Sequence, residues 1–165
     1  MAVLTEGAAA PDFSAQTLDG KSFSLKESLA NGPVVLAFFK VSCPTCQYAF
    51  PFLQRLFEAY KNQGVLLIGV SQNEASDTNM FVEQYGVKFP IVLDDTKRFP
   101  VSNAYGLTNV PTLFWICPEG DIELVSTGWN RKDFEAINLR IAETGKLPLL
   151  PPFQPGEEVR DFRAG

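Results

Sequence analysis

Two uninterrupted apolar runs mark the centre of the predicted fold. The first covers residues 34–39, Val-Val-Leu-Ala-Phe-Phe, and the second covers residues 65–70, Val-Leu-Leu-Ile-Gly-Val. Each run is too short for a typical helix and lacks the alternation of a half-exposed strand. Such runs are typical of strands whose two faces are both covered. The pattern therefore predicts two buried strands at the centre of a sheet.

An amphipathic helix is predicted directly after the first run. Apolar residues recur there at the i, i+3, i+4, i+7 spacing of one helix face. They are Leu53, Leu56, Phe57 and Tyr60. The helix opens at Cys43-Pro44-Thr45-Cys46, Pro51 inside it is expected to bend it, and Gly64 is expected to end it.

Shorter segments on both sides complete an α/β pattern. Residues 11–25 predict an N-terminal hairpin with a turn at 18–21, since Asp-Gly favours tight turns. Further strands are predicted at 89–93, 112–116 and 122–127, and further helices at 75–85, around 101–105 and at 131–144, with Gly145 as a stop. The order includes a βαβ-type insertion, and the last two strands form an antiparallel hairpin. We therefore expect a central mixed β-sheet flanked by helices.

The chain divides into one domain and a tail. Residues 1–146 carry the periodic segments, including the hairpin region at 7–30, whereas residues 147–165 are rich in proline and charge. We expect no periodic element in this C-terminal tail. Two alternatives stay open for it: a tail lying over the domain, or a disordered arm.

Charge and hydropathy narrow the class of partner. The 165 residues carry a formal net charge of −5, with a pI near 4.8, which argues against nucleic acid as a partner. No apolar run approaches the length of a membrane segment, and residues 1–10 contain no basic residue before a hydrophobic stretch. These features predict a cytoplasmic protein, although a periplasmic protein trimmed of its export segment would look the same.

The cysteines carry the candidate chemistry. There are three, with no histidine anywhere, so a structural zinc site would need carboxylates or a second chain. Cys43 and Cys46 are separated by two residues at a predicted helix start, which favours the thiolate of Cys43 through unpaired backbone N–H groups. We therefore predict Cys43 as the nucleophile of thiol-disulfide exchange and Cys46 as the resolving thiol. No bound cofactor or metal is needed.

Several short motifs together resemble one family. They include Ala10-Pro11-Asp12-Phe13, Phe38-Phe39 before Cys43-Pro44-Thr45-Cys46, Phe50-Pro51, Tyr85-Gly86-Val87, and Val110-Pro111-Thr112. The sequence resembles the thioredoxin superfamily, in particular the TlpA/ResA-like redoxins, which share features with the AhpC/TSA peroxiredoxins. The resemblance covers about residues 7–145. It implies a thioredoxin fold, a cis peptide bond before Pro111, and a client-binding surface to which Pro44, Thr45, Val110 and Pro111 contribute.

Two departures from that family concern proton transfer. Thioredoxin carries a buried aspartate where this chain has Ala37, and ResA-type proteins carry a glutamate where it has Ala49. Both acids that would help to deprotonate the second cysteine are missing. Lys40 could favour the Cys43 thiolate electrostatically, or could simply be a solvated lysine at a strand end.

The sequence thus predicts a thiol-disulfide oxidoreductase that acts on client proteins with disulfides or dithiols, or on small-molecule thiols. A separate redox partner protein would supply electrons or oxidising equivalents. One alternative is a thiol peroxidase, although Leu36 and Lys40 stand where peroxiredoxins carry proline and threonine or serine. Another is a binding module that kept the fold. Cys117 is expected to be a core residue, and Asp94 and Asp95 to be solvated rather than metal ligands.

Overall fold

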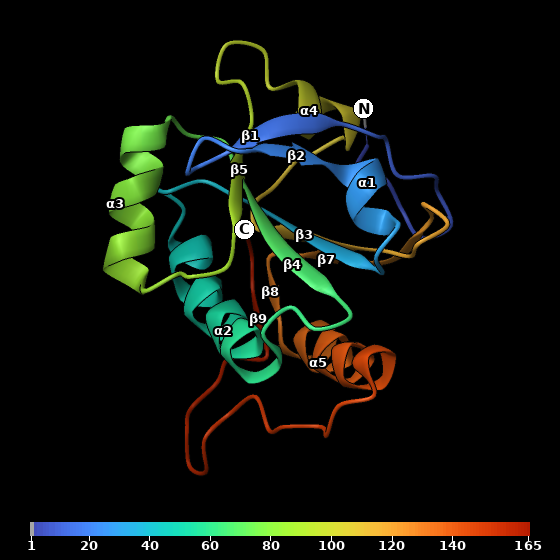
Figure 1. The fold of residues 1–165 in the computed structure, drawn as a ribbon. Helices are drawn as coiled ribbons and strands as arrows, with labels where there is room; N and C mark the ends of the chain where they lie inside the picture. Colours follow the sequence, from blue (N-terminus) through green and yellow to red (C-terminus); the bar gives the residue numbers. More distant parts are fainter. Residues whose placement is uncertain (1) are drawn as a thin grey trace.

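A seven-stranded mixed sheet organises the chain, and a computed structural model describes it over residues 2–165 (Figure 1). The strand order is β2-β1-β5-β4-β3-β6-β7. The strands of this sheet are β1 (Ser14–Thr17), β2 (Ser22–Ser24), β3 (Val34–Phe39), β4 (Leu66–Ser71), β5 (Ile91–Leu93), β6 (Thr112–Ile116) and β7 (Ile122–Thr127). A second sheet pairs β8 (Trp129–Asn130) with β9 (Phe162–Arg163), and the helices are α1 (Leu25–Leu29), α2 (Pro44–Tyr60), α3 (Ala75–Tyr85), α4 (Pro100–Ala104) and α5 (Arg131–Gly145). The predicted α/β fold with a central mixed sheet is confirmed.

The central strand β3 explains why its sequence is continuously apolar. It runs parallel to β4 and antiparallel to β6, and all six of its side chains are buried. Val35, Ala37 and Phe39 face the core under α2, α3 and α5. The alternate residues face a second core, which α1 and α4 cover. Two covered faces leave no position on this strand for a polar residue.

The N-terminal hairpin is confirmed, with one correction at its end. Ser14–Thr17 pairs antiparallel with Ser22–Ser24, and β1 also pairs with β5. Leu25, predicted as the last residue of the second strand, instead begins the short helix α1. The Ser24 side chain accepts a hydrogen bond from the backbone N–H of Glu27 and caps that helix.

The helix α2 begins and ends by local backbone devices. It runs without interruption through Pro51, but it ends at Tyr60 and not near Gly64 as predicted. Lys61 and Asn62 adopt left-handed conformations, and the Lys61 N–H donates to the Phe57 carbonyl at 2.7 Å. Gly64 serves close packing instead, since a Cβ atom there would lie 3.0 Å from the Cα of Gly145.

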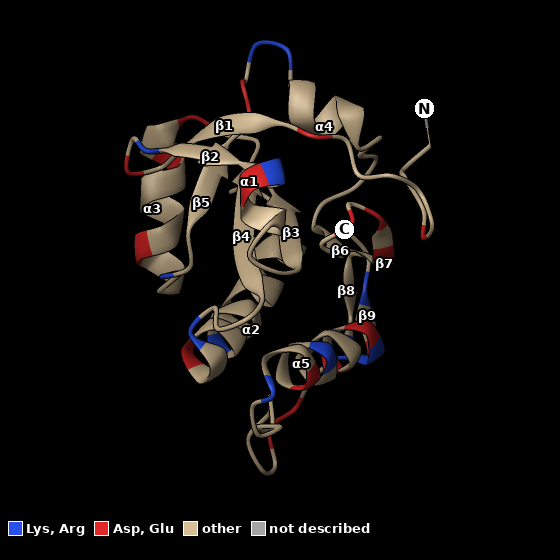
Figure 2. Cartoon of the chain, turned by 45° about the vertical axis from the view of Figure 1, so that its right-hand side comes forward, with Lys and Arg blue, Asp and Glu red and all other residues tan. Residues whose placement is uncertain are grey.

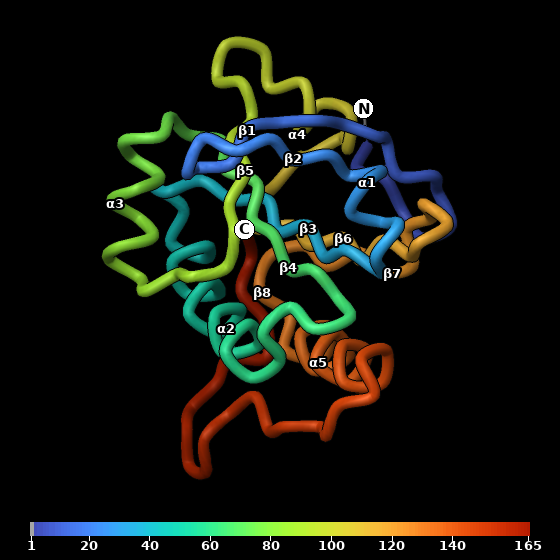
Figure 3. Tube along the Cα trace, viewed as in Figure 1, coloured from blue at the N-terminus to red at the C-terminus, as the bar shows by residue number. Residues whose placement is uncertain are grey.

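The tail lies over the domain beside α2 and α5 and returns toward the sheet (Figures 1 and 3). The prediction that it holds no periodic element is wrong at one place, because Phe162–Arg163 pairs antiparallel with Trp129–Asn130 as β9. Prolines occupy only the stretch before that strand, so the last residues keep the N–H groups that pairing requires.

Candidate functional site

The cysteine pair lies shortly after the end of the central strand β3, at the beginning of the helix α2. Cys43 is the N-cap of α2, with Pro44 at its first turn, and the Cys43 sulfur accepts the backbone N–H of Cys46 at 3.2 Å. The Cys43 N–H donates to the Lys40 carbonyl at 3.2 Å, and the Gln47 side chain donates to the Val41 carbonyl at 2.9 Å. These bonds fix the loop that presents Cys43.

The beginning of α2 is electrostatically suited to a negative sulfur. The first turn holds no acidic residue, and no charged side chain occurs between Lys40 and Arg55. In Figure 2 charged residues lie mainly on outer helix faces and loops, while the buried strands at the centre of the sheet are uncharged. A helix N-terminus offers unpaired N–H groups and the positive end of its dipole, so it stabilises a thiolate at the N-cap.

The two cysteines differ sharply in exposure. Cys43 is partly exposed, whereas Cys46 is fully buried in the core that includes Ala49 and Phe50. Burial raises the pKa of the Cys46 thiol strongly, and the neighbouring Cys43 raises that pKa further. A reagent from solution can therefore reach Cys43 first, and Cys46 stays protonated at neutral pH.

The loop before β6 meets the cysteine pair from the other side. The Val110–Pro111 peptide bond is cis, in agreement with the expectation from the family resemblance. The Cys43 thiol donates to the Val110 carbonyl at 3.3 Å. Pro111 is buried, and its carbonyl accepts the N–H of Gly128 at 2.7 Å. Residues far apart in sequence, Cys43 and Val110, are thus brought into direct contact.

The two residues between the cysteines have different surroundings. Pro44 is exposed, while Thr45 is almost completely buried. The Thr45 hydroxyl donates to the carbonyl of Ala164 at 2.6 Å, in the tail. Sequence reasoning missed Ala164 as a neighbour of the site because a carbonyl group leaves no signature in residue type.

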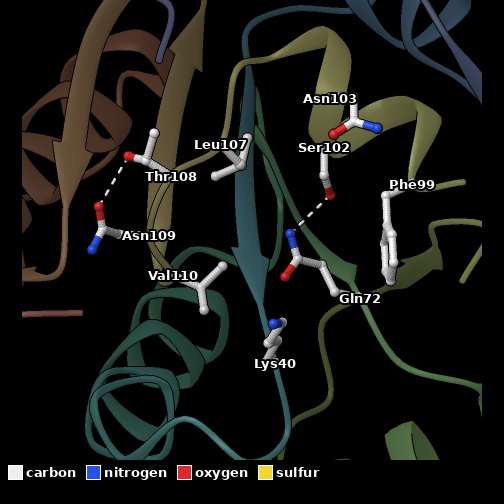
Figure 4. Close-up of a pocket in the computed structure, with 9 residues that line it drawn as sticks. All are labelled: Lys40, Gln72, Phe99, Ser102, Asn103, Leu107, Thr108, Asn109 and Val110. Carbon is white, nitrogen blue, oxygen red and sulfur yellow. Dashed lines mark hydrogen bonds between the residues drawn. The ribbon is translucent and has the colours of Figure 1, made fainter. Parts of the chain in front are cut away.

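Lys40 and Val110 both line a cavity of about 250 Å³ (Figure 4). Lys40 is the one charged residue among the nine that line this cavity, and the others include Gln72, Ser102 and Asn109. The Gln72 side chain donates to the Ser102 hydroxyl at 2.9 Å. Within residues 2–165 no carboxylate lies within ion-pair distance of Lys40. The positive charge of Lys40 can therefore pair with a negatively charged group bound in this cavity.

The positions of the missing acids are filled by the core. Ala37 and Ala49 are both buried among apolar side chains. In the described part of the chain no carboxylate hydrogen-bonds to either Cys43 or Cys46. The site therefore places no acid next to Cys46 that could take its proton.

Asp94 corrects a further expectation. It is buried, not solvated, and its carboxylate accepts the N–H groups of Val101 and Ser102 at 3.1 and 2.8 Å and the Ser102 hydroxyl at 2.7 Å. It therefore acts as a structural cap for α4. Across residues 2–165, no cluster of three or more acidic, cysteine or histidine side chains is arranged to hold a metal ion.

Cys117 lies far from the pair along the fold. It follows β6, whose last residue Ile116 is paired with Val34 at the start of β3, whereas Cys43 follows the end of β3. Its side chain is buried, and its backbone N–H donates to the backbone carbonyl of Asp121 at 2.9 Å. These contacts agree with a core residue.

Comparison with known proteins gives consistent results. The AhpC/TSA family model matches residues 7–125. Thiol-disulfide oxidoreductase ResA from Halalkalibacterium halodurans is 40% identical over 123 residues, which cover 74% of this chain and 68% of that protein.

Solved structures agree on the fold. A protein from Bacteroides thetaiotaomicron, proposed to be a protein disulfide isomerase, superposes with a TM-score of 0.79 at 27% identity, over 88% of this chain and 95% of that one. The thioredoxin domain of a thiol-disulfide oxidoreductase from Bacteroides vulgatus gives a TM-score of 0.73 at 23% identity, over 84% and 99% of the two chains. No helix among residues 2–165 is long and apolar enough to cross a membrane. The fold, the family match and these relatives together show that the chain belongs to the AhpC/TSA family and, within it, to the TlpA/ResA-like thiol-disulfide oxidoreductases.

Proposed function

We propose that Cys43 and Cys46 together exchange a dithiol for a disulfide with client proteins. The observation that carries this proposal is the asymmetry of the pair: a partly exposed sulfur at the start of α2 and a fully buried thiol one turn later. Exchange requires one thiolate that meets the client and one thiol that acts only afterwards. The two environments match these two requirements.

The reductive direction proceeds in two balanced steps. The Cys43 thiolate attacks one sulfur of a client disulfide, a bond forms between them, and the other client sulfur leaves as a thiolate. Cys46 then loses its proton and attacks the Cys43 sulfur, which releases the second client sulfur and leaves a Cys43–Cys46 disulfide. A separate thiol protein supplies the two electrons that restore the dithiol. The oxidative direction is the reverse of these steps.

The surroundings of Cys43 support a role in docking. The Val110 carbonyl is adjacent to the reacting sulfur and Thr45 presents a hydroxyl nearby, so an extended client backbone can find polar partners there. Pro44 and Pro111 restrict the two loops that frame this edge. The cavity that Lys40 lines shares Val110 with this edge, and its single positive charge favours a client with an acidic side chain. The proposed substrates are therefore client proteins that carry disulfides or dithiols. Small-molecule thiols are proposed as further exchange partners of the same cysteine pair.

The direction of exchange depends on the potential of the pair against that of its compartment. The location of the protein in the cytoplasm remains a prediction. A redox titration of the Cys43–Cys46 couple against glutathione buffers measures the relevant potential directly.

Peroxide reduction is disfavoured by where two side chains point. Leu36 and Lys40 occupy the positions at which peroxiredoxins carry polar or proline residues. Leu36 is fully buried in the core opposite to that of Cys46, and Lys40 is exposed. Neither can form a peroxide pocket around the Cys43 sulfur.

Hydrogen peroxide is expected to oxidise Cys43 at least about 10²–10³-fold more slowly than it oxidises a dedicated peroxidase cysteine, because no preorganised donors stabilise the leaving oxygen. Stopped-flow tryptophan fluorescence is the readout, and Trp129 contacts the helix that begins at Cys43, since its ring stacks on Phe52 of α2 with 4.9 Å between the ring centroids. The same reduced protein, mixed with a protein disulfide and excess dithiol, should turn over catalytically. Fast peroxide reduction without disulfide turnover would replace the proposed function by the peroxidase alternative.

A further inference from the structure

The last five residues of the tail lie on the edge where a client would dock. β9 pairs with β8, and the Arg131 N–H donates to the Asp161 carbonyl at 2.9 Å, which brings the chain alongside the start of α5. The segment then continues to the cysteine motif, where the Ala164 carbonyl accepts the Thr45 hydroxyl. Figure 3 shows this red segment running beside the orange β8. The tail thus reaches Thr45, which lies between the two cysteines in the sequence.

Close backbone contacts make this arrangement specific. A Cβ atom added to Gly165 would overlap the Val110 carbonyl oxygen, the same oxygen that accepts the Cys43 thiol. Gly128 has a φ of +70°, and a Cβ atom there would lie 2.5 Å from the Arg163 carbonyl oxygen. Glycine at both places lets the tail backbone approach the site as closely as a bound peptide would.

The tail has a firmly held part before this segment. Arg55 forms a two-point ion pair with Glu157, with both N–O distances at 2.7 Å, and the Trp129 indole donates to the Arg160 carbonyl at 2.7 Å. The Arg55 guanidinium holds the pKa of Glu157 at about 2. Phe153 is partly buried and packs against Phe52 and Phe134 at the edge of the core cluster. We name residues 147–160 the anchor.

Residues 161–165, which we name the gate, are held much less firmly. Phe162 is 58% exposed, and four of the five gate residues are exposed. No gate side chain forms a salt bridge in the described chain. The gate is attached mainly through backbone groups: the pairing with β8, the Arg131 bond to Asp161, the Thr45 bond and the contact with Val110. Among its side chains, the Arg163 guanidinium lies 5.8 Å from the centre of the Tyr48 ring. Such backbone contacts can be exchanged for equivalent contacts with another extended peptide at little cost.

We propose that the gate is an intramolecular competitor of client peptides. It occupies the backbone edge formed by β8, Thr45 and Val110, and an extended client segment displaces it while the anchor stays in place. This inference rests on the proposed function, since the edge it covers is the proposed docking edge. The gate reduces the apparent affinity for clients to the intrinsic affinity multiplied by the fraction of time for which the gate is open. Small disulfides, which need only the Cys43 sulfur, are hardly affected.

The test compares the full chain with a chain that ends at Asp161. Attack by Cys43 is measured in stopped flow on two substrates: a disulfide between extended peptides, and a small aromatic disulfide. Removal of residues 162–165 is expected to accelerate attack on the peptide disulfide about tenfold and attack on the small disulfide less than about twofold. Circular dichroism and thermal unfolding verify that the anchor still folds.

Two full-length variants keep the test decisive. Gly165→Val pushes the gate off the Val110 carbonyl and should accelerate the peptide reaction in the same direction, though less. Glu158→Gln, at an exposed anchor residue, is the matched control and should leave both rates unchanged. Equal acceleration of both substrates, or no acceleration of the peptide reaction by either gate variant, would overturn the gate. If neither substrate reacts with any of the chains, the proposed function itself fails.

Discussion

A Cys43→Ser variant is expected to lose attack on disulfides by at least about 10³-fold, which leaves only background exchange. A serine hydroxyl is hardly ionised at neutral pH, and the chain has no histidine to activate it. The N-terminus of a helix can stabilise a thiolate, but this stabilisation falls far short of what ionising a hydroxyl requires. Turnover of a protein disulfide in excess dithiol measures the loss.

Cys117→Ser is the matched control for this substitution. It makes the same chemical change at a buried cysteine beyond the far end of β6. Its turnover should stay close to that of the unmodified chain. A variant at Cys43 that keeps turnover, or a variant at Cys117 that loses it while still folded, would assign the nucleophile to the wrong cysteine.

The release of the client is expected to accelerate about tenfold per pH unit between roughly pH 6 and 9. The attacking thiol in this step is Cys46, whose pKa is raised chiefly by burial, so at these pH values only a small and growing fraction is thiolate. The contribution of Cys43 to that raised pKa disappears once Cys43 is in the mixed disulfide, but burial remains. A higher pH therefore increases the reactive fraction.

Single-turnover release from a preformed mixed disulfide at Cys43 measures this dependence separately from the first attack. The Ala37 and Ala49 positions offer no acid that would relay the proton. A rate independent of pH over this range would mean that another group accepts the Cys46 proton, and the assignment of a slow, unassisted release would be wrong.

Much of the fold was predictable because its signals are strong and local. The apolar runs that form β3 and β4 are buried on both faces, so their sequence could hardly belong to another element. The position of the cysteine pair at the start of α2 was predictable because an apolar strand precedes the pair and an amphipathic helix pattern follows it. The helix α1 was missed because five residues carry too little periodicity, and its cap at Ser24 resembles a strand end.

The surroundings of the site were less predictable, for a different reason. Asp94 can be buried because two backbone N–H groups of α4 donate hydrogen bonds to its carboxylate. The types of the neighbouring residues do not indicate that these bonds form. The gate contacts the site through backbone carbonyl groups and at two glycines. Every residue has a carbonyl group and glycines are common in loops, so neither feature singles out these residues in the sequence. Long-range contacts made by backbone atoms leave no periodic pattern along the chain.

Separate trapping by Cys46→Ser and Cys43→Ser tests the central claim, that the two cysteines perform different steps. Each variant is incubated with the same disulfide-containing protein, alkylated, and separated on a non-reducing gel. Cys46→Ser should accumulate a mixed disulfide through Cys43 that excess thiol removes, and Cys43→Ser should accumulate none. Equal trapping by both variants, or trapping by neither where the unmodified chain turns over, would contradict the assignment of Cys43 as nucleophile and Cys46 as resolving thiol.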